Sequence, residues 1–271
     1  MTIPLTIQLI PPAIGASHTH TVVFLHGRGS TAVNFSNDLS LSRDSKGYTL
    51  TDLFPTVRWI FPQANISPCV TRPGERISQW FDVWDATNLA DHEELQAEGL
   101  KESVDSVRAI IEREAAKLGG RWERIILMGI SQGGATCVHI LLNLRVAPRP
   151  PPAEGDTVVA EAPPRLGAFV GFCTRMPFPG RTLAETRAIL GLSEDMAADN
   201  DQVVRNTPVL LQHCADDRVV KIESGRELRD TLQRFGARVT WQEYAEGGHW
   251  LHSPEGIENC AAWLKEHVFN N

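Results

Sequence analysis

Short apolar runs alternate along the chain with amphipathic stretches, which predicts a mostly parallel β-sheet covered by helices. Several runs are apolar at consecutive positions, as is typical of strands buried between two helix layers. The predicted strands are TVVFLH (21–26), VRWIFP (57–62), RIILMGI (124–130), LGAFVGF (166–172), TPVLLQHC (207–214) and ARVTWQEY (237–244). This order predicts a doubly wound α/β fold, with helices on both faces of the sheet.

Three amphipathic stretches are predicted to be helices: residues 93–118, 221–235 and 254–268. The first has apolar residues at helical spacing and ends at Gly119-Gly120, a pair that favours a helix terminus. Its apolar stripe consists of Leu100, Val104, Val107, Ile111, Ala115 and Leu118.

Two segments interrupt this alternation. Residues 147–165 are proline-rich and acidic, so we expect an exposed or disordered surface loop at the sheet edge away from any site. Residues 173–206 follow a strand and should border the ligand-binding edge of the sheet. We weigh equally two interpretations of this segment, that it shapes the pocket and that it has no part in the site. Thr182 and Glu185 form a capping-box pattern there, which predicts a short helix.

Length and charge limit the class of protein. A chain of 271 residues with 42% hydrophobic positions can form one large core, so we expect a single domain over residues 1–271. The formal net charge of −7 argues against nucleic-acid binding.

The N-terminal stretch lacks a basic region and its apolar run is broken by prolines, so we do not expect a signal peptide. We also expect no stable membrane insertion, because no apolar run is long enough to span a bilayer. The five cysteines are far apart and form no metal-like pair, which favours free thiols in a reducing, cytoplasmic compartment. They are Cys69, Cys137, Cys173, Cys214 and Cys260.

The pentapeptide Gly129-Ile130-Ser131-Gln132-Gly133 matches the G-x-S-x-G pattern of a nucleophile elbow. Five residues can match by chance, so the context decides. A predicted strand precedes the motif, and residues 133–144 continue as a predicted helix. A sharp turn between them would hold Ser131 clear of the sheet as a nucleophile.

A serine nucleophile needs a base and an acid that orients that base. His249 follows two glycines in the loop after the last predicted strand, and we favour it over His252, which lies next to a helix start. Asp216 and Asp217 follow the preceding strand, although turn aspartates are often structural. The order Ser131, Asp217, His249 is that of an α/β-hydrolase triad.

An oxyanion hole requires two backbone donors. The residue after the nucleophile, Gln132, supplies one. The glycine-containing loop FLHGRGS (24–30) supplies the other at Arg28, whose side chain is not needed for this task. His26 could be mistaken for a base, but we expect it to brace the loop. No metal or organic cofactor is implied.

With these features the chain resembles the acyl-protein thioesterase and carboxylesterase family, which includes lysophospholipases. The matching segments are FLHGRG (24–29), WFD (80–82), GISQGGA (129–135), LLQHCADDRVV (210–220) and GGH (247–249). The resemblance implies an α/β-hydrolase fold, Asp217 as the acid, and Arg28 and Gln132 as the oxyanion donors. It places Trp80 near an acyl groove as a substrate-binding residue, while a core aromatic is an equal alternative.

Three differences in sequence and the two interrupting segments, 147–165 and 173–206, distinguish the chain from the compact family pattern, and one of the differences, at Arg28, puts a cation near the pocket. HCA (213–215) replaces the usual HGD, Arg218 replaces a proline, and Arg28 stands where leucine is common. They leave the expected reaction unchanged but weigh against a long-chain lipid substrate.

We therefore expect a serine hydrolase for carboxylic esters or thioesters, with an acylated protein or a lysophospholipid among the candidate substrates. We expect a monomer or a weak homodimer. The alternatives are a small-molecule, specialised-metabolite esterase and, less favoured, a non-catalytic ligand-binding α/β-hydrolase.

Overall fold

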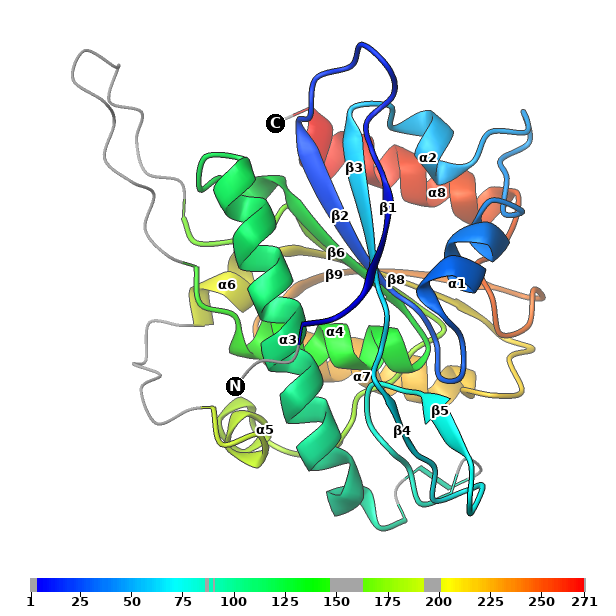
Figure 1. Ribbon diagram of the computed structural model, residues 1–271, viewed down its shortest axis with the longest axis vertical. Helices are drawn as coiled ribbons and strands as arrows, with labels where there is room; N and C mark the ends of the chain where they lie inside the picture. The colour runs from blue at the N-terminus through cyan, green and yellow to red at the C-terminus, as the bar shows by residue number, and fades with distance from the viewer. Residues whose placement is uncertain (1–3, 86–87, 90, 147–162, 193–200, 271) are drawn as a thin grey trace.

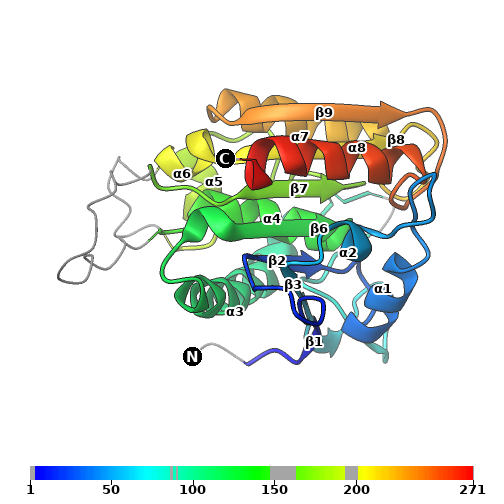
Figure 2. The same ribbon diagram turned by 90° about the horizontal axis from the view of Figure 1, so that it is seen from above.

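A seven-stranded sheet runs through the computed structural model, which describes residues 4–85, 88–89, 91–146, 163–192 and 201–270 (Figures 1 and 2). The strand order is β1-β3-β2-β6-β7-β8-β9; β1 is antiparallel to β3 and the other pairs are parallel. The strands are β1 (Ile7–Ile10), β2 (His20–Leu25), β3 (Val57–Pro62), β6 (Ile125–Ile130), β7 (Ala168–Phe172), β8 (Pro208–Cys214) and β9 (Arg238–Tyr244). All six predicted strands are confirmed.

Helices cover both faces of the sheet, as the sequence predicted (Figure 1). The helices are α1 (Ala32–Leu39), α2 (Leu50–Leu53), α3 (Gln96–Lys117), α4 (Gln132–Asn143), α5 (Leu183–Ile189), α6 (Asp201–Asn206), α7 (Ile222–Arg234) and α8 (Glu255–Leu264). A short hairpin of β4 (Ile66–Pro68) and β5 (Arg76–Ser78) stands apart from the main sheet. Within the described ranges, no helix combines the length and apolar character that a membrane span requires.

Two apolar cores lie on opposite faces of the sheet. One packs α3, α4 and α7 against side chains such as Leu127, and the other packs α1, α2 and α8 against the alternate side chains Ile126 and Met128. Because β6 is buried on both faces, its six residues are all apolar or glycine. Continuous apolar runs in the sequence therefore marked the central strands.

The predicted helix over residues 93–118 is confirmed from Gln96, while Glu93–Leu95 forms a 3₁₀ turn. Its predicted apolar stripe is buried. The helix ends where Gly119 and Gly120 adopt φ values of +69° and +75°, a left-handed conformation that glycine enters without steric cost.

The segment after β7 contains the predicted short helix, α5, and its capping box is formed: the Thr182 hydroxyl accepts from the Glu185 N–H, and the Glu185 carboxylate accepts from the Thr182 N–H. The sequence did not predict α6. Of the predicted proline-rich loop, residues 147–162 lie outside the described residues.

The turn from β6 into α4 is tight enough to require glycine on both sides of Ser131. A Cβ on Gly129 would lie 2.6 Å from the carbonyl carbon of Gly133. A Cβ on Gly133 would lie 2.7 Å from the Leu25 carbonyl carbon and collide with its oxygen. Ser131 itself has φ +56° and ψ −126°, a strained conformation for a non-glycine residue.

This contact predicts that Gly133→Ala destabilises the protein by about 2–3 kcal/mol, because the methyl group meets rigid backbone rather than a mobile side chain. Urea denaturation would measure the free energy of unfolding. Gly27→Ala is the matched control, since its Cβ would approach Ser131 Cβ only to an ordinary 3.4 Å. Equal stability of the two variants would contradict this account of the turn.

Candidate active site

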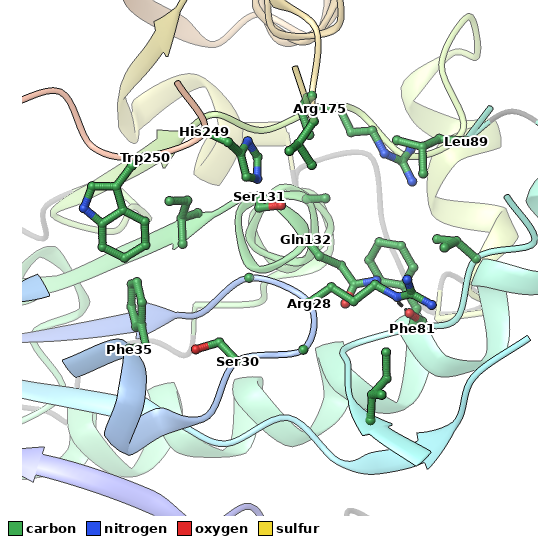
Figure 3. Close-up of a pocket in the computed structure, with 18 of the residues that line it drawn as sticks. Arg28, Ser30, Phe35, Phe81, Leu89, Ser131, Gln132, Arg175, His249 and Trp250 are labelled. Carbon is green, nitrogen blue, oxygen red and sulfur yellow. Dashed lines mark hydrogen bonds between the residues drawn. The ribbon is translucent and has the colours of Figure 1, made fainter. Parts of the chain in front are cut away.

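The side chains singled out in the sequence meet at the carboxyl edge of the sheet. Ser131 follows β6, Asp217 follows β8 and His249 follows β9. Ser131 and His249 line one cavity of about 430 Å³. Figure 3 shows the imidazole of His249 beside the Ser131 hydroxyl.

Asp217 is a buried carboxylate with a full set of donors. Nδ1 of His249 lies 2.7 Å from Asp217 Oδ2, and the backbone N–H groups of Val219 and Val220 donate to Oδ1 at 2.8 and 2.9 Å. The Asp217 side chain has no exposed surface. These contacts fix both the carboxylate and the ring of His249.

His213, which sequence reasoning did not assign to the site, also approaches this carboxylate. Its Nε2 lies 3.3 Å from Asp217 Oδ2 and 2.8 Å from the Val220 carbonyl oxygen, an acceptor that requires the proton on Nε2. Burial by itself would raise the pKa of Asp217. The hydrogen bonds from His213 and His249 outweigh burial and lower that pKa below its ordinary range. The signal available in the sequence was a histidine at the end of a strand, four residues before the acid.

The backbone of the loop after β2 packs directly onto the serine. A Cβ on Gly27 would lie 3.4 Å from Ser131 Cβ and 3.8 Å from its Oγ. Arg28 follows in the same loop, and both Arg28 and Gln132 line the cavity with Ser131. As the first residue of α4, Gln132 has an N–H that the helix itself does not satisfy.

The Gln132 side chain ties the turn to the segment after β5. It accepts from the Trp80 N–H at 2.9 Å and donates to the Phe81 carbonyl at 2.7 Å. Trp80 is 1% exposed, and its indole N–H donates to the His26 carbonyl. Phe81, rather than Trp80, lines the cavity. The geometry favours the core interpretation of Trp80 that the sequence left open.

The Arg28 side chain is held by groups of the hairpin region. It donates to Gln79 at 2.9 Å and to Thr71 at 3.0 Å, and it lies 3.4 Å from the Asp82 carboxylate. The sequence placed a cation near the pocket at this position. In the structure that cation has an anionic partner.

The remaining polar residues of the motif regions have structural contacts. Nε2 of His26 accepts from the Ala64 N–H at 3.1 Å, which braces the loop as expected. Nδ1 of His252 accepts from the Gly256 N–H in the first turn of α8, and its ring stacks on Tyr244 at 4.2 Å. Asp216 accepts from the Gly248 N–H at 2.8 Å and so anchors the loop before His249.

All five cysteines are free and buried. Cys173, His213 and Asp217 each place one potential ligand atom within 4.8 Å of the others. However, the histidine proton points at Val220, and the aspartate oxygens accept from His249 and two backbone groups. Because these atoms are already engaged, we assign no metal to the cluster.

The lowered pKa of Asp217 gives its contribution to stability a defined pH dependence. That contribution is complete above the ordinary value of 3.8 and is lost as the pH falls toward the lower native pKa. We expect Asp217→Asn to lose about 1–3 kcal/mol of stability near pH 7. The difference from the wild type should shrink below about pH 4.

Urea denaturation from about pH 7 to pH 3 would measure this difference. Asp216→Asn is the matched control, because it removes the same charge from an exposed position of the same turn. A difference that stays constant with pH for Asp217→Asn would contradict the ion-pair account.

Comparison with known proteins finds relatives that align with most of the chain. Acyl-protein thioesterase 1 of Gibberella zeae is 28% identical over 264 residues, which cover 96% of this chain and 95% of that protein. Carboxylesterase SOBER1 of Arabidopsis thaliana is 26% identical over 211 residues, covering 78% and 77%.

Solved structures share the architecture. Zea mays acyl-protein thioesterase 2 aligns with a TM-score of 0.71 at 23% identity, covering 97% of this chain and 99% of that one. Esterase PE8 aligns with a TM-score of 0.68 at 21% identity, covering 98% and 100%. The chain has the α/β-hydrolase fold. The family model described as phospholipase/carboxylesterase matches residues 12–148, about half of the sequence. This chain therefore belongs to the phospholipase/carboxylesterase family.

Proposed function

We propose that the protein is a serine hydrolase that cleaves carboxylic esters or thioesters through an acyl-enzyme. The observation that carries this proposal is the hydrogen bond from His249 to the buried Asp217, because His249 lines one cavity together with a strained Ser131. A buried acid that orients a histidine beside a serine is the arrangement that activates a hydroxyl for acyl transfer. We propose that residues 1–271 form one such catalytic domain.

In the first half-reaction, His249 takes the proton from Ser131 Oγ while Oγ attacks the substrate carbonyl carbon. The N–H groups of Arg28 and Gln132 donate to the oxyanion that forms. The tetrahedral intermediate then collapses, the bond to the leaving oxygen or sulfur breaks, and protonated His249 gives its proton to the leaving group. Asp217 stabilises the transient imidazolium.

In the second half-reaction, water attacks the acyl-serine and His249 takes a proton from that water. Collapse of the second intermediate breaks the acyl bond to Oγ, which regains the proton from His249. No step draws on a cofactor.

The names of the relatives support two substrate classes, thioesters of acylated proteins and carboxylic esters. A lysophospholipid and a specialised metabolite remain alternatives within the same chemistry. A non-catalytic binding role is disfavoured, because the serine, histidine and acid are all present and two of them are hydrogen-bonded. Buried free cysteines fit a reducing compartment, and we propose a cytoplasmic location and a monomer or weak homodimer.

We expect Ser131→Ala to lower kcat/KM for ester substrates by at least about 10³-fold while the urea midpoint stays close to that of the wild type. Ser30→Ala is the matched control, because Ser30 lines the same cavity without a place in the proposed mechanism. A fluorophosphonate probe, read by intact mass, should label the wild type and Ser30→Ala once and leave Ser131→Ala unlabelled. Undiminished turnover by Ser131→Ala would overturn the proposal.

Matched oxyesters and thioesters of increasing acyl length would separate the substrate classes. A preference for long acyl thioesters supports a deacylase for lipidated proteins. A preference for short oxyesters supports a small-molecule esterase.

A further inference from the structure

One end of the cavity carries a buried guanidinium that the proposed mechanism does not use. Arg175 belongs to the segment that follows β7, is 8% exposed and lines the same cavity as Ser131. Figure 3 shows it on the side of the cavity where Phe81 and Leu89 lie, away from Trp250 and Phe35.

The hydrogen bonds of this guanidinium go to neutral acceptors. Nη2 of Arg175 donates to Gln96 Oε1 at 2.7 Å, and Nη1 donates to the Met176 carbonyl at 3.4 Å. Among the described residues, no carboxylate lies within 4.0 Å of it. The acid whose field acts on it most is Glu93, and the Glu93 carboxylate accepts from the Phe178 N–H at 2.6 Å.

Arg175 stays charged at neutral pH. Burial lowers the pKa of its guanidinium to about 10, and the field of Glu93 acts in the opposite direction. A buried charge without a close counter-ion is costly to the folded protein, and buried charges in proteins are normally paired. An anionic ligand in the cavity would supply the missing partner.

Each of the other charged residues of the cavity lining either lies near an opposite charge or is exposed to solvent. Arg28 lies beside Asp82, and the exposed Arg72 lies 3.6 Å from the equally exposed Glu75. Asp38 is exposed to solvent. Arg175 is thus the buried cation of the lining that has no close anion in the described part of the chain.

The stereochemistry of acyl transfer assigns this end of the cavity to the acyl group. The leaving group must face His249 to receive its proton, so it lies toward Trp250, the neighbour of His249. The acyl group then extends to the opposite side, past Phe81 and Leu89 to Arg175 (Figure 3). Apolar walls that end at a fixed cation suit a methylene chain with an anionic end.

We propose that Arg175 binds a carboxylate at the far end of the acyl group, so that the preferred substrates are half-esters or half-thioesters of dicarboxylic acids. The proposal rests on the proposed hydrolase function. A planar guanidinium matches a carboxylate with two parallel hydrogen bonds, which a neutral acyl terminus cannot provide.

The test compares mono(4-nitrophenyl) adipate and suberate with the same diacids capped as methyl esters, so that chain length is matched and only the terminal charge differs. We expect the wild type to favour the free acids by about tenfold or more in kcat/KM. Arg175→Met should abolish this preference and improve turnover of the capped esters, while Arg175→Lys should retain part of it. Arg72→Met, which removes a rim charge, should leave the preference within about twofold of the wild type.

A wild type that treats free and capped esters alike, or an Arg175→Met enzyme that keeps the preference, would overturn the inference while leaving the hydrolase intact. Failure of the proposed function has a different signature, since no ester would then show turnover that depends on Ser131. If Arg175→Met does not fold, inhibition of the wild type replaces it: adipate and suberate should inhibit at least about tenfold better than hexanoate and octanoate. Equal inhibition would also overturn the inference.

Discussion

The site depends on one close contact between backbones, where the start of α4 lies against the end of β2. The Leu25 carbonyl fills the space that a side chain at Gly133 would occupy. Because neither backbone can give way, the turn before α4 forces Ser131 into a left-handed φ and out of the sheet. Every residue of α4 is buried, and its packing between the sheet and α3 holds the strained turn in place. The strain is thus local, and the core offsets it.

Asp217 has a comparable role just beyond the end of β8. Its carboxylate joins the end of β8, through His213, to the loop after β9, through His249. Burying a carboxylate opposes folding, but four N–H groups from side chains and backbone compensate for the lost water. The same bonds that keep the acid ionised also orient the ring of His249. Stability and the alignment of the site therefore have the same physical origin.

The sequence predicted the central strands, the long helix α3 and the capping box of α5, because periodicity and local hydrogen bonds encode these features. The sequence also predicted that Ser131, Asp217 and His249 lie near one another, because each of them follows a predicted strand. The half-exposed edge strand β1 and the six-residue α6 carry too little periodicity to be found. His213 contacts an acid only four residues further along the chain. In contrast, the exchange of Phe81 for Trp80 in the cavity lining depends on packing between distant segments. No local pattern specifies such contacts.

Arg28 and Arg175 show the same limit for charge. The sequence drew attention to Arg28, because a motif fixed its place in the loop beside the serine. Arg175 lies outside the segments that match the family, and an arginine without such a motif is usually exposed. In the folded protein the side-chain charge of Arg28 has a partner, because Asp82 lies within 3.4 Å of it. The charge of Arg175, in contrast, is buried against neutral acceptors. The charge that a substrate would meet inside the cavity is therefore a property of the tertiary structure, and the proposed preference for an acyl group with an anionic end rests on that charge.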